Sequence, residues 1–159
     1  MKIKYYIKKG INGFLSPLGY RITHKQNQIT LSDVLERQIK RNILINTVID
    51  VGASNGQWTD IVTHYFPDAF YYLIEANPYH MDSLQVYKTK HKNVDFILAA
   101  AADQMGEISF DGKDPLGGLA YYSSHREGDL RAPMTTVDIE VATKQLKPPF
   151  LLKLDTHCF

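Results

Sequence analysis

The stretch Thr47-Val48-Ile49-Asp50-Val51-Gly52-Ala53-Ser54-Asn55-Gly56 decides the fold class of this chain. Its first five residues form a short run rich in β-branched side chains, which is typical of a strand buried on both faces. The run breaks at Gly52, and from Asn55 onward apolar residues recur with helical spacing until Pro67. The stretch therefore predicts a buried strand, a glycine turn and a helix.

Strand and helix signals alternate on both sides of this stretch. Thr30 can cap a helix with Asp33 three residues on, and Asn77 before Pro78 is typical of a second helix start. The expected strands are 70–75, 94–101 and 150–155, and the expected helices are 30–41, 55–66, 78–90 and 138–145. The alternation predicts an α/β fold with a mainly parallel sheet and helices on both faces.

The regular alternation of strand and helix signals ends between residues 102 and 137. Two strand-like pieces, 106–110 and 119–122, surround the turn-rich segment 111–118. This pattern predicts a hairpin-like insertion or a mobile loop. A further short extended piece is expected over 134–137.

Size, charge and cysteine content exclude several classes of protein. The chain has 159 residues, enough for one modest domain, and its 18 basic and 17 acidic residues give a formal charge of +1. A nucleic-acid partner is not expected from so small a net charge. The single Cys158 allows no internal disulfide, and no apolar run approaches the ~20 residues of a membrane span. We therefore expect a cytoplasmic protein.

The basic residues gather near the N-terminus. All six charged residues between Met1 and Ser32 are positive, and apolar side chains lie among them. One interpretation is an amphipathic helix in weak peripheral contact with an anionic membrane, and the other is an extension packed on the main domain. We expect residues 1–45 to form this extension and its helix, and residues 46–159 to form the main domain.

The glycine turn is the expected ligand site, because open α/β sheets bind ligands at the carboxyl ends of their strands. Gly52 and Gly56 lie four residues apart, which does not fit the dinucleotide pattern G-x-G-x-x-G. Asp50 would repel a pyrophosphate, but it suits the ammonium of S-adenosylmethionine, whose carboxylate the loop N–H groups can receive. A purely structural turn is the alternative.

Glu75 supports a nucleoside ligand. It stands 25 residues after Asp50, at the end of the next strand, where a carboxylate can accept both hydroxyls of a ribose. An acid at this place also occurs in NAD-binding domains, so the choice of cofactor depends on Asp50 and the loop spacing. These favour S-adenosylmethionine over NAD.

Several motifs, taken in order, resemble those of FkbM-family methyltransferases. They are Val48–Trp58, Leu73–Pro78, the Ala100–Gly106 stretch, Thr135–Asp138 and Leu151–Thr156. The resemblance implies a Rossmann-like class I methyltransferase fold that uses S-adenosylmethionine. It also implies an acceptor hydroxyl on a sugar, a glycan or another small secondary metabolite.

The resemblance also assigns roles to single residues. The loop would hold the methionine end of the cofactor, Glu75 its ribose, and Ala76 with the region of Ala101 and Asp103 its adenine. The complete expected cofactor set is Asp50, Gly52, Ala53, Ser54, Asn55, Gly56, Glu75, Ala76, Ala101 and Asp103. Asp155 and His157 are the candidate catalytic residues, either of them able to take the hydroxyl proton. Asp155 could instead help to hold a divalent metal, although no metal-ligand set is assigned.

The resemblance ends at the C-terminus of the chain. Where the family motif normally continues into a glycine and a glutamate, this chain has Cys158 and stops at Phe159. About four of the seven strands usual in the family are accounted for. We therefore expect a C-terminally truncated chain, poorly stable and inactive alone. The alternatives are a non-catalytic remnant of a nucleotide-binding fold and, less favoured, an NAD-binding oxidoreductase domain.

Overall fold

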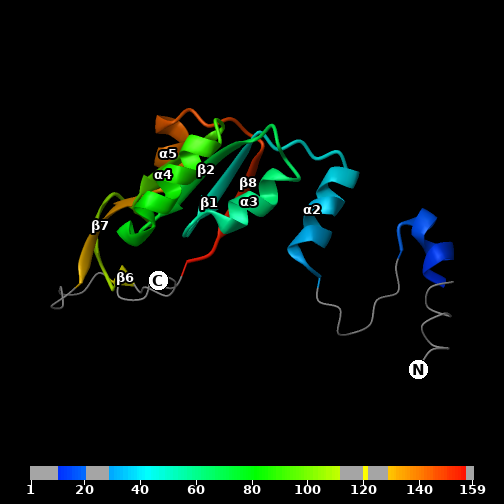
Figure 1. Cartoon of the computed structure of the whole chain (residues 1–159), viewed down its shortest axis with the longest axis horizontal. Coiled ribbons are helices and arrows are strands. Elements are labelled where there is room, and N and C mark those ends of the chain that lie inside the picture. Colours follow the sequence, from blue (N-terminus) through cyan, green and yellow to red (C-terminus); the bar gives the residue numbers. More distant parts are fainter. Residues whose placement is uncertain (1–10, 21–28, 112–119, 122–128, 157–159) are drawn as a thin grey trace, which may run out of the picture. The chain divides into compact units, whose positions relative to one another are not determined.

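The computed structural model describes residues 11–20, 29–111, 120–121 and 129–156 (Figure 1). The chain divides into two compact units, Met1–Arg37 and Gln38–Phe159. In the first unit, residues 11–15 are helical and lead into a short 3-10 helix, η1 (Ser16–Leu18). The basic residues at positions 2–9, on which the expected membrane contact depends, lie outside the described part. Among the described helices, none has the length and apolar character needed to cross a bilayer.

The helix α2 (Leu31–Lys40) begins in the first unit and ends in the second. Its predicted capping is confirmed. The backbone N–H of Thr30 donates to Asp33 Oδ2 at 3.0 Å, and the N–H of Asp33 donates to Thr30 Oγ1 at 3.2 Å. These two bonds satisfy donors that the first turn of a helix leaves without partners.

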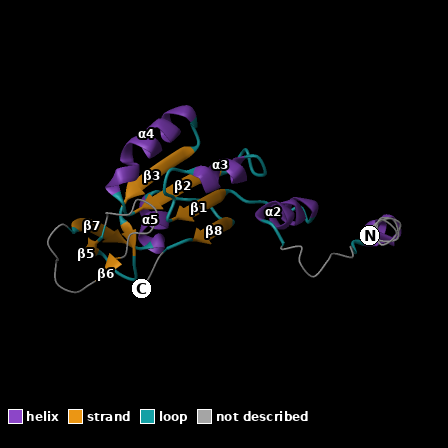
Figure 2. Ribbon diagram, turned by 60° about the horizontal axis from the view of Figure 1, so that its bottom comes forward, coloured by secondary structure: helices purple, strands orange, loops and turns teal. Residues whose placement is uncertain are grey.

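The main sheet of the second unit is parallel throughout, as predicted. It contains β1 (Thr47–Val51), β2 (Phe70–Glu75), β3 (Val94–Leu98) and β8 (Phe150–Leu154), in the order β3-β2-β1-β8 (Figure 2). In the register, Asp50 lies beside Leu73 on one neighbouring strand and beside Lys153 on the other. The carboxyl ends of all four strands therefore meet at one edge, where the loop after β1 lies.

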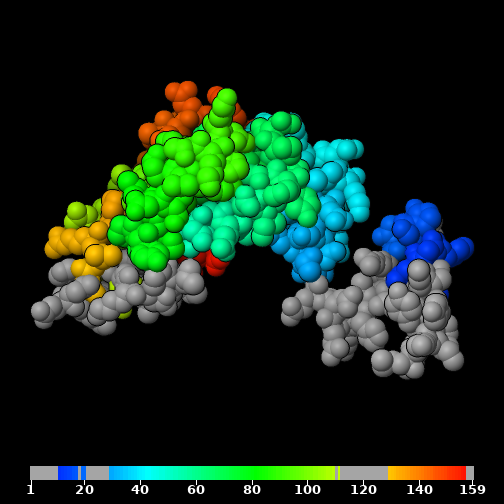
Figure 3. Space-filling model, viewed as in Figure 1, coloured from blue at the N-terminus to red at the C-terminus, as the bar shows by residue number. Residues whose placement is uncertain are grey.

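Helices cover both faces of this sheet. On one face lie α3 (Gln57–Thr63), the 3-10 turn η2 (Pro78–His80) and α4 (Met81–Lys90), whose atoms hide the strands in the space-filling view (Figure 3). On the other face lies α5 (Val137–Thr143). Its residues Val137 and Val141 pack on a buried apolar cluster of the β1 and β2 strands and the segment after α5: Ile49, Val51, Tyr72, Ile74 and Leu146.

A second sheet adjoins the end of β3. It contains β4 (Ala100–Ala101), β7 (Leu130–Thr135), β5 (Gly106–Phe110) and β6 (Ala120–Tyr121), in the order β4-β7-β5-β6. β5 and β6 pair antiparallel, which confirms the hairpin-like arrangement predicted for this region. Residues 112–119 lie outside the described part. The strand expected over 94–101 is divided at Ala99, whose N–H donates to the Glu75 carbonyl at 2.8 Å. β4 then leaves the first sheet and pairs with β7.

The apolar run over 150–155 predicts a buried strand, and this prediction is wrong for one face of β8. Phe150, Leu152 and Leu154 are 39%, 45% and 67% exposed. β8 lies at the edge of the sheet, and α5 covers the inner strands. An apolar run alone does not distinguish an edge strand from a central one, which explains the error.

Asp95 on β3 connects two other elements of the unit by ion pairs. Its carboxylate oxygens lie 2.7 Å from Lys88 Nζ on α4 and 2.9 Å from Lys144 Nζ at the end of α5. Burial by itself would raise the pKa of Asp95, but the two lysines outweigh it and hold the pKa below its usual value.

We expect the substitution Asp95→Asn to lower the free energy of unfolding at pH 7, because both ion pairs are lost. The loss should be only about 1 kcal/mol, because both pairs are partly exposed. A carboxyl with a lowered pKa stabilises the folded state above its unfolded pKa of about 3.9, and the effect is lost as the pH falls through the folded value. Urea unfolding of both proteins at pH 7 and near pH 3.5 checks this. A difference that is unchanged at the lower pH would contradict it.

Candidate functional site

The loop between β1 and α3 turns the chain back sharply at the carboxyl edge of the sheet. Gly52, Ser54 and Gly56 have positive φ angles of 73°, 51° and 85°. The N–H groups of Gly52 and Ala53 both donate to the carbonyl of Ile74, at 2.9 and 3.3 Å. The loop is therefore fixed to the end of β2 as well as to its own strand.

The two glycines are required for different reasons. A Cβ at Gly52 would lie 2.0 Å from the carbonyl oxygen of Asp155, so the backbone that follows β8 crosses directly over this position. A Cβ at Gly56 would lie 3.4 Å from the ring of Tyr87, so this glycine allows α3 to start close to α4. The close neighbour of Gly56 is thus a helix, and the close neighbour of Gly52 is the backbone of the chain itself.

Glu75 joins the end of β2 to this loop. Its Oε2 accepts the N–H of Ser54 at 2.7 Å, and its Oε1 accepts the N–H of Asn77 at 2.8 Å. The residue is 8% exposed. Asp50 and Glu75 therefore lie at the same edge of the sheet, on either side of one loop, as the sequence predicted.

Asp50 has a different environment from the one expected. It is 0% exposed, and its Oδ2 accepts the hydroxyl of Thr59 at 2.6 Å. Its Oδ1 lies 2.9 Å from Lys153 Nζ, which neutralises it as an ion pair. Burial raises the pKa of Asp50, while Thr59 and Lys153 act in the opposite direction. Both oxygens thus face groups of the chain, and a direct contact between Asp50 and a ligand ammonium is not supported.

Lys153 is a site residue that the sequence reasoning missed. Besides facing Asp50, its ammonium donates to the carbonyl of Gly52 at 2.7 Å and lies 5.6 Å from the ring centre of Trp58. The sequence did contain a signal for this role: Lys153 is a charged residue within an apolar strand, and such a lysine needs a counter-charge. The register that places it beside Asp50 was not available from the sequence.

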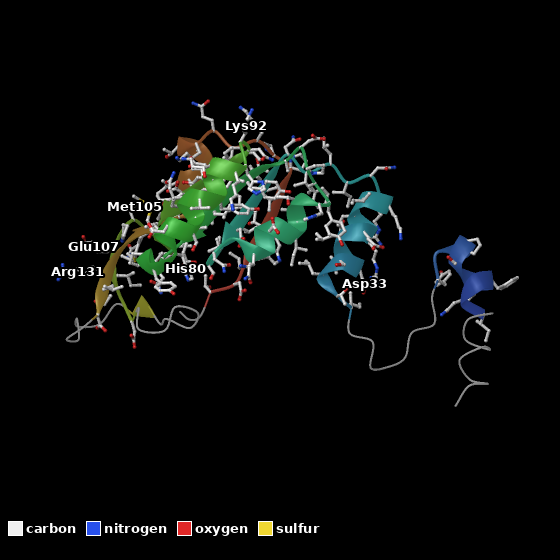
Figure 4. The ribbon with its side chains drawn as sticks, in the orientation of Figure 1. Asp33, His80, Lys92, Met105, Glu107 and Arg131 are labelled. Atoms are coloured by element: carbon white, nitrogen blue, oxygen red, sulfur yellow. The ribbon has the colours of Figure 1, made fainter. Side chains whose placement is uncertain are left out.

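His80 is a second residue that was missed. It is 3% exposed and lies at the N-terminal end of α4 (Figure 4). Its Nε2 is 3.3 Å from Ser54 Oγ. Ser54 thus contacts Glu75 through its N–H and His80 through its hydroxyl.

The remaining predicted residues are placed as follows. Ala53 is buried, and Asn55 is exposed with its Oδ1 accepting the N–H of Gln57 at 3.3 Å. Ala76 and Ala101 each pack against an apolar cluster, and Asp103 is exposed.

Of the two candidate catalytic residues, Asp155 has a side chain that is 71% exposed, with Oδ2 3.6 Å from Lys153 Nζ. His157 lies outside the described residues. Within the described ranges, no group of three or more His, Cys, Asp or Glu side chains could hold a metal ion.

No protein-family model matches the sequence, and no curated protein matches it. Among solved structures, the chain is similar to a precorrin-6y C5,15-methyltransferase from Geobacter metallireducens, with a TM-score of 0.35 and 17% identity. The similarity covers 52% of this chain and 44% of that protein. The α/β fold assignment rests on the sheet order and register of this chain.

Proposed function

We propose that this chain binds S-adenosylmethionine at the carboxyl edge of its parallel sheet. We propose further that it acts in methyl transfer to a hydroxyl of a sugar, a glycan or another secondary metabolite. One observation carries the proposal: the carboxylate of Glu75 accepts the N–H of Ser54, so the acid after β2 and the glycine loop after β1 form one unit. The motif resemblance to FkbM-family methyltransferases supports the choice of cofactor and acceptor.

The residues present fit a nucleoside at Glu75. Each carboxylate oxygen has two lone-pair positions, and one backbone N–H occupies one position on each oxygen. The second position on each oxygen can accept a ribose hydroxyl. The backbone bonds also fix the orientation of the carboxylate before a ligand arrives, which lowers the entropy cost of binding.

When bound, the cofactor supplies an electrophilic methyl group on a sulfonium. The chain has to hold the acceptor oxygen in line with that methyl and remove the hydroxyl proton, and alignment alone contributes a large part of such a rate. Asp155 is the proposed base, since its exposed carboxylate follows β8 at the same edge as the loop. His157 remains the alternative base.

We expect Glu75→Gln to weaken the binding of S-adenosylhomocysteine by about 10- to 100-fold, because a charge-assisted acceptor for the ribose is lost. Isothermal titration calorimetry on the 159-residue chain measures this. Glu107→Gln is the matched control, since Glu107 lies on β5 with a side chain that is 69% exposed. It should leave the affinity unchanged.

Thermal unfolding of both variants separates a binding effect from a folding effect. Titration with NADH distinguishes the proposal from an NAD-binding domain. Binding of NADH but not of S-adenosylhomocysteine would overturn the proposed cofactor, and so would a wild-type chain that is folded and binds neither ligand.

A further inference from the structure

The glycine loop uses most of its own N–H groups internally. Those of Gly52 and Ala53 donate to the Ile74 carbonyl, and that of Ser54 donates to Glu75. The N–H of Gly56 donates to the carbonyl of Ala53 at 2.9 Å. A loop with its donors committed in this way is a poor receptor for a ligand carboxylate, so a carboxylate that binds here needs another donor.

In the described part of the chain, the ammonium of Lys153 contacts this loop. Its Nζ lies 2.7 Å from the carbonyl oxygen of Gly52 and 2.9 Å from Asp50 Oδ1. An ammonium has three N–H donors. In the described part of the chain, the next acceptor near this ammonium is Asp155 Oδ2 at 3.6 Å, which is too far for a hydrogen bond. One donor is therefore available in the direction of Asp155.

We infer that Lys153 is a specificity-determining residue that binds the carboxylate of the cofactor's amino-acid end with this third donor. The inference rests on the proposed function. Asp50 acts through Lys153: it is fully buried, it holds the ammonium at the loop, and Thr59 fixes its other oxygen. Lys153 is itself only 14% exposed, so its ammonium meets a ligand in a partly desolvated setting, where a charged hydrogen bond is strong.

The experiment compares two ligands that differ in one group. S-adenosylhomocysteine has the carboxylate, and its decarboxylated analogue lacks it but keeps the ammonium and the nucleoside. We expect the wild-type chain to bind the first about tenfold or more tightly than the second by calorimetry. In Lys153→Met this ratio should fall to about 1, and Lys153→Arg should restore most of it.

Two controls keep the inference separate from folding. Lys88→Met, on the exposed face of α4, should leave the ratio at the wild-type value. If Lys153→Met does not fold, the pair Asp50→Asn with Lys153→Met removes both charges together and should also give a ratio of about 1.

The outcomes are distinguishable from failure of the proposed function. If neither ligand binds the wild-type chain, the proposed function fails. If both bind the wild-type chain equally well, or if loss of Lys153 weakens both ligands by the same factor, the nucleoside site stands and the role of Lys153 in carboxylate recognition is overturned.

Discussion

Replacing Gly52 by alanine is expected to lower the free energy of unfolding by about 3–5 kcal/mol, and the midpoint of thermal unfolding by roughly 10 °C. Two costs add. The φ angle of +73° disfavours any residue with a side chain, and the new Cβ would lie 2.0 Å from the carbonyl oxygen of Asp155. That oxygen belongs to the backbone, so a rotamer change cannot relieve the clash.

Gly56→Ala is the matched control. Its φ angle is +85°, but a Cβ there would lie 3.4 Å from the Tyr87 ring, a side chain that can shift slightly. We expect a loss of only about 1–2 kcal/mol, which is the backbone cost. Differential scanning calorimetry of both variants tests the comparison. Equal losses would show that the chain after β8 does not press on Gly52.

The clash at Gly52 also links stability to the proposed site. The N–H of Asp155 donates to the carbonyl of Val51 at 3.1 Å, so an alanine at 52 would push away the segment that holds Asp155. Because Asp155 is the proposed base, we expect the variant to lose methyl-transfer activity as well.

The sequence was sufficient for the elements whose signals are local. The strand over 47–51 and the Asn77 cap before Pro78 depend on neighbouring residues, and both appear as predicted. The helix expected over 78–90 begins as the 3-10 turn η2 and is α-helical from Met81. The parallel direction of the strands followed from the alternation of strands and helices. What the sequence could not supply was pairing between distant segments. The break at Ala99 depends on a partner strand that begins at Leu130, and this partner contains Pro133, which weakens its strand signal.

The same limit applied at the site. The loop and Glu75 could be predicted, since each follows directly from a strand end. The environment of Asp50 could not, because its partner Lys153 is far away in the chain and only the β1–β8 register brings the two together. A carboxylate that looked free to bind a ligand is therefore held by the chain.

Replacing Lys153 by methionine is expected to destabilise the fold by about 3 kcal/mol at pH 7, because the carboxylate of Asp50 is then buried without its counter-charge. Lys88→Met is the matched control, since its pair with Asp95 at 2.7 Å is of similar length but partly exposed. That control should cost about 1 kcal/mol or less. Urea unfolding of both variants measures the difference.

The pH dependence gives the sharper test. Burial already raises the pKa of Asp50, and loss of Lys153 removes an influence that lowers it. An acid whose folded pKa is raised loses stability as the pH rises from its unfolded value of about 3.9 through the folded one. The penalty of Lys153→Met should therefore be largest near neutral pH and shrink as the pH falls to below about 3.9, where Asp50 becomes protonated in both the folded and the unfolded state.

A second substitution isolates the buried charge as the cause. Adding Asp50→Asn to Lys153→Met leaves an amide oxygen to accept the Thr59 hydroxyl but removes the uncompensated charge. Most of the lost stability should return, and the pH dependence of the penalty should disappear. If the double variant is instead as unstable as Lys153→Met at every pH, the cost lies in the lost packing of the lysine side chain against Trp58 rather than in the ion pair.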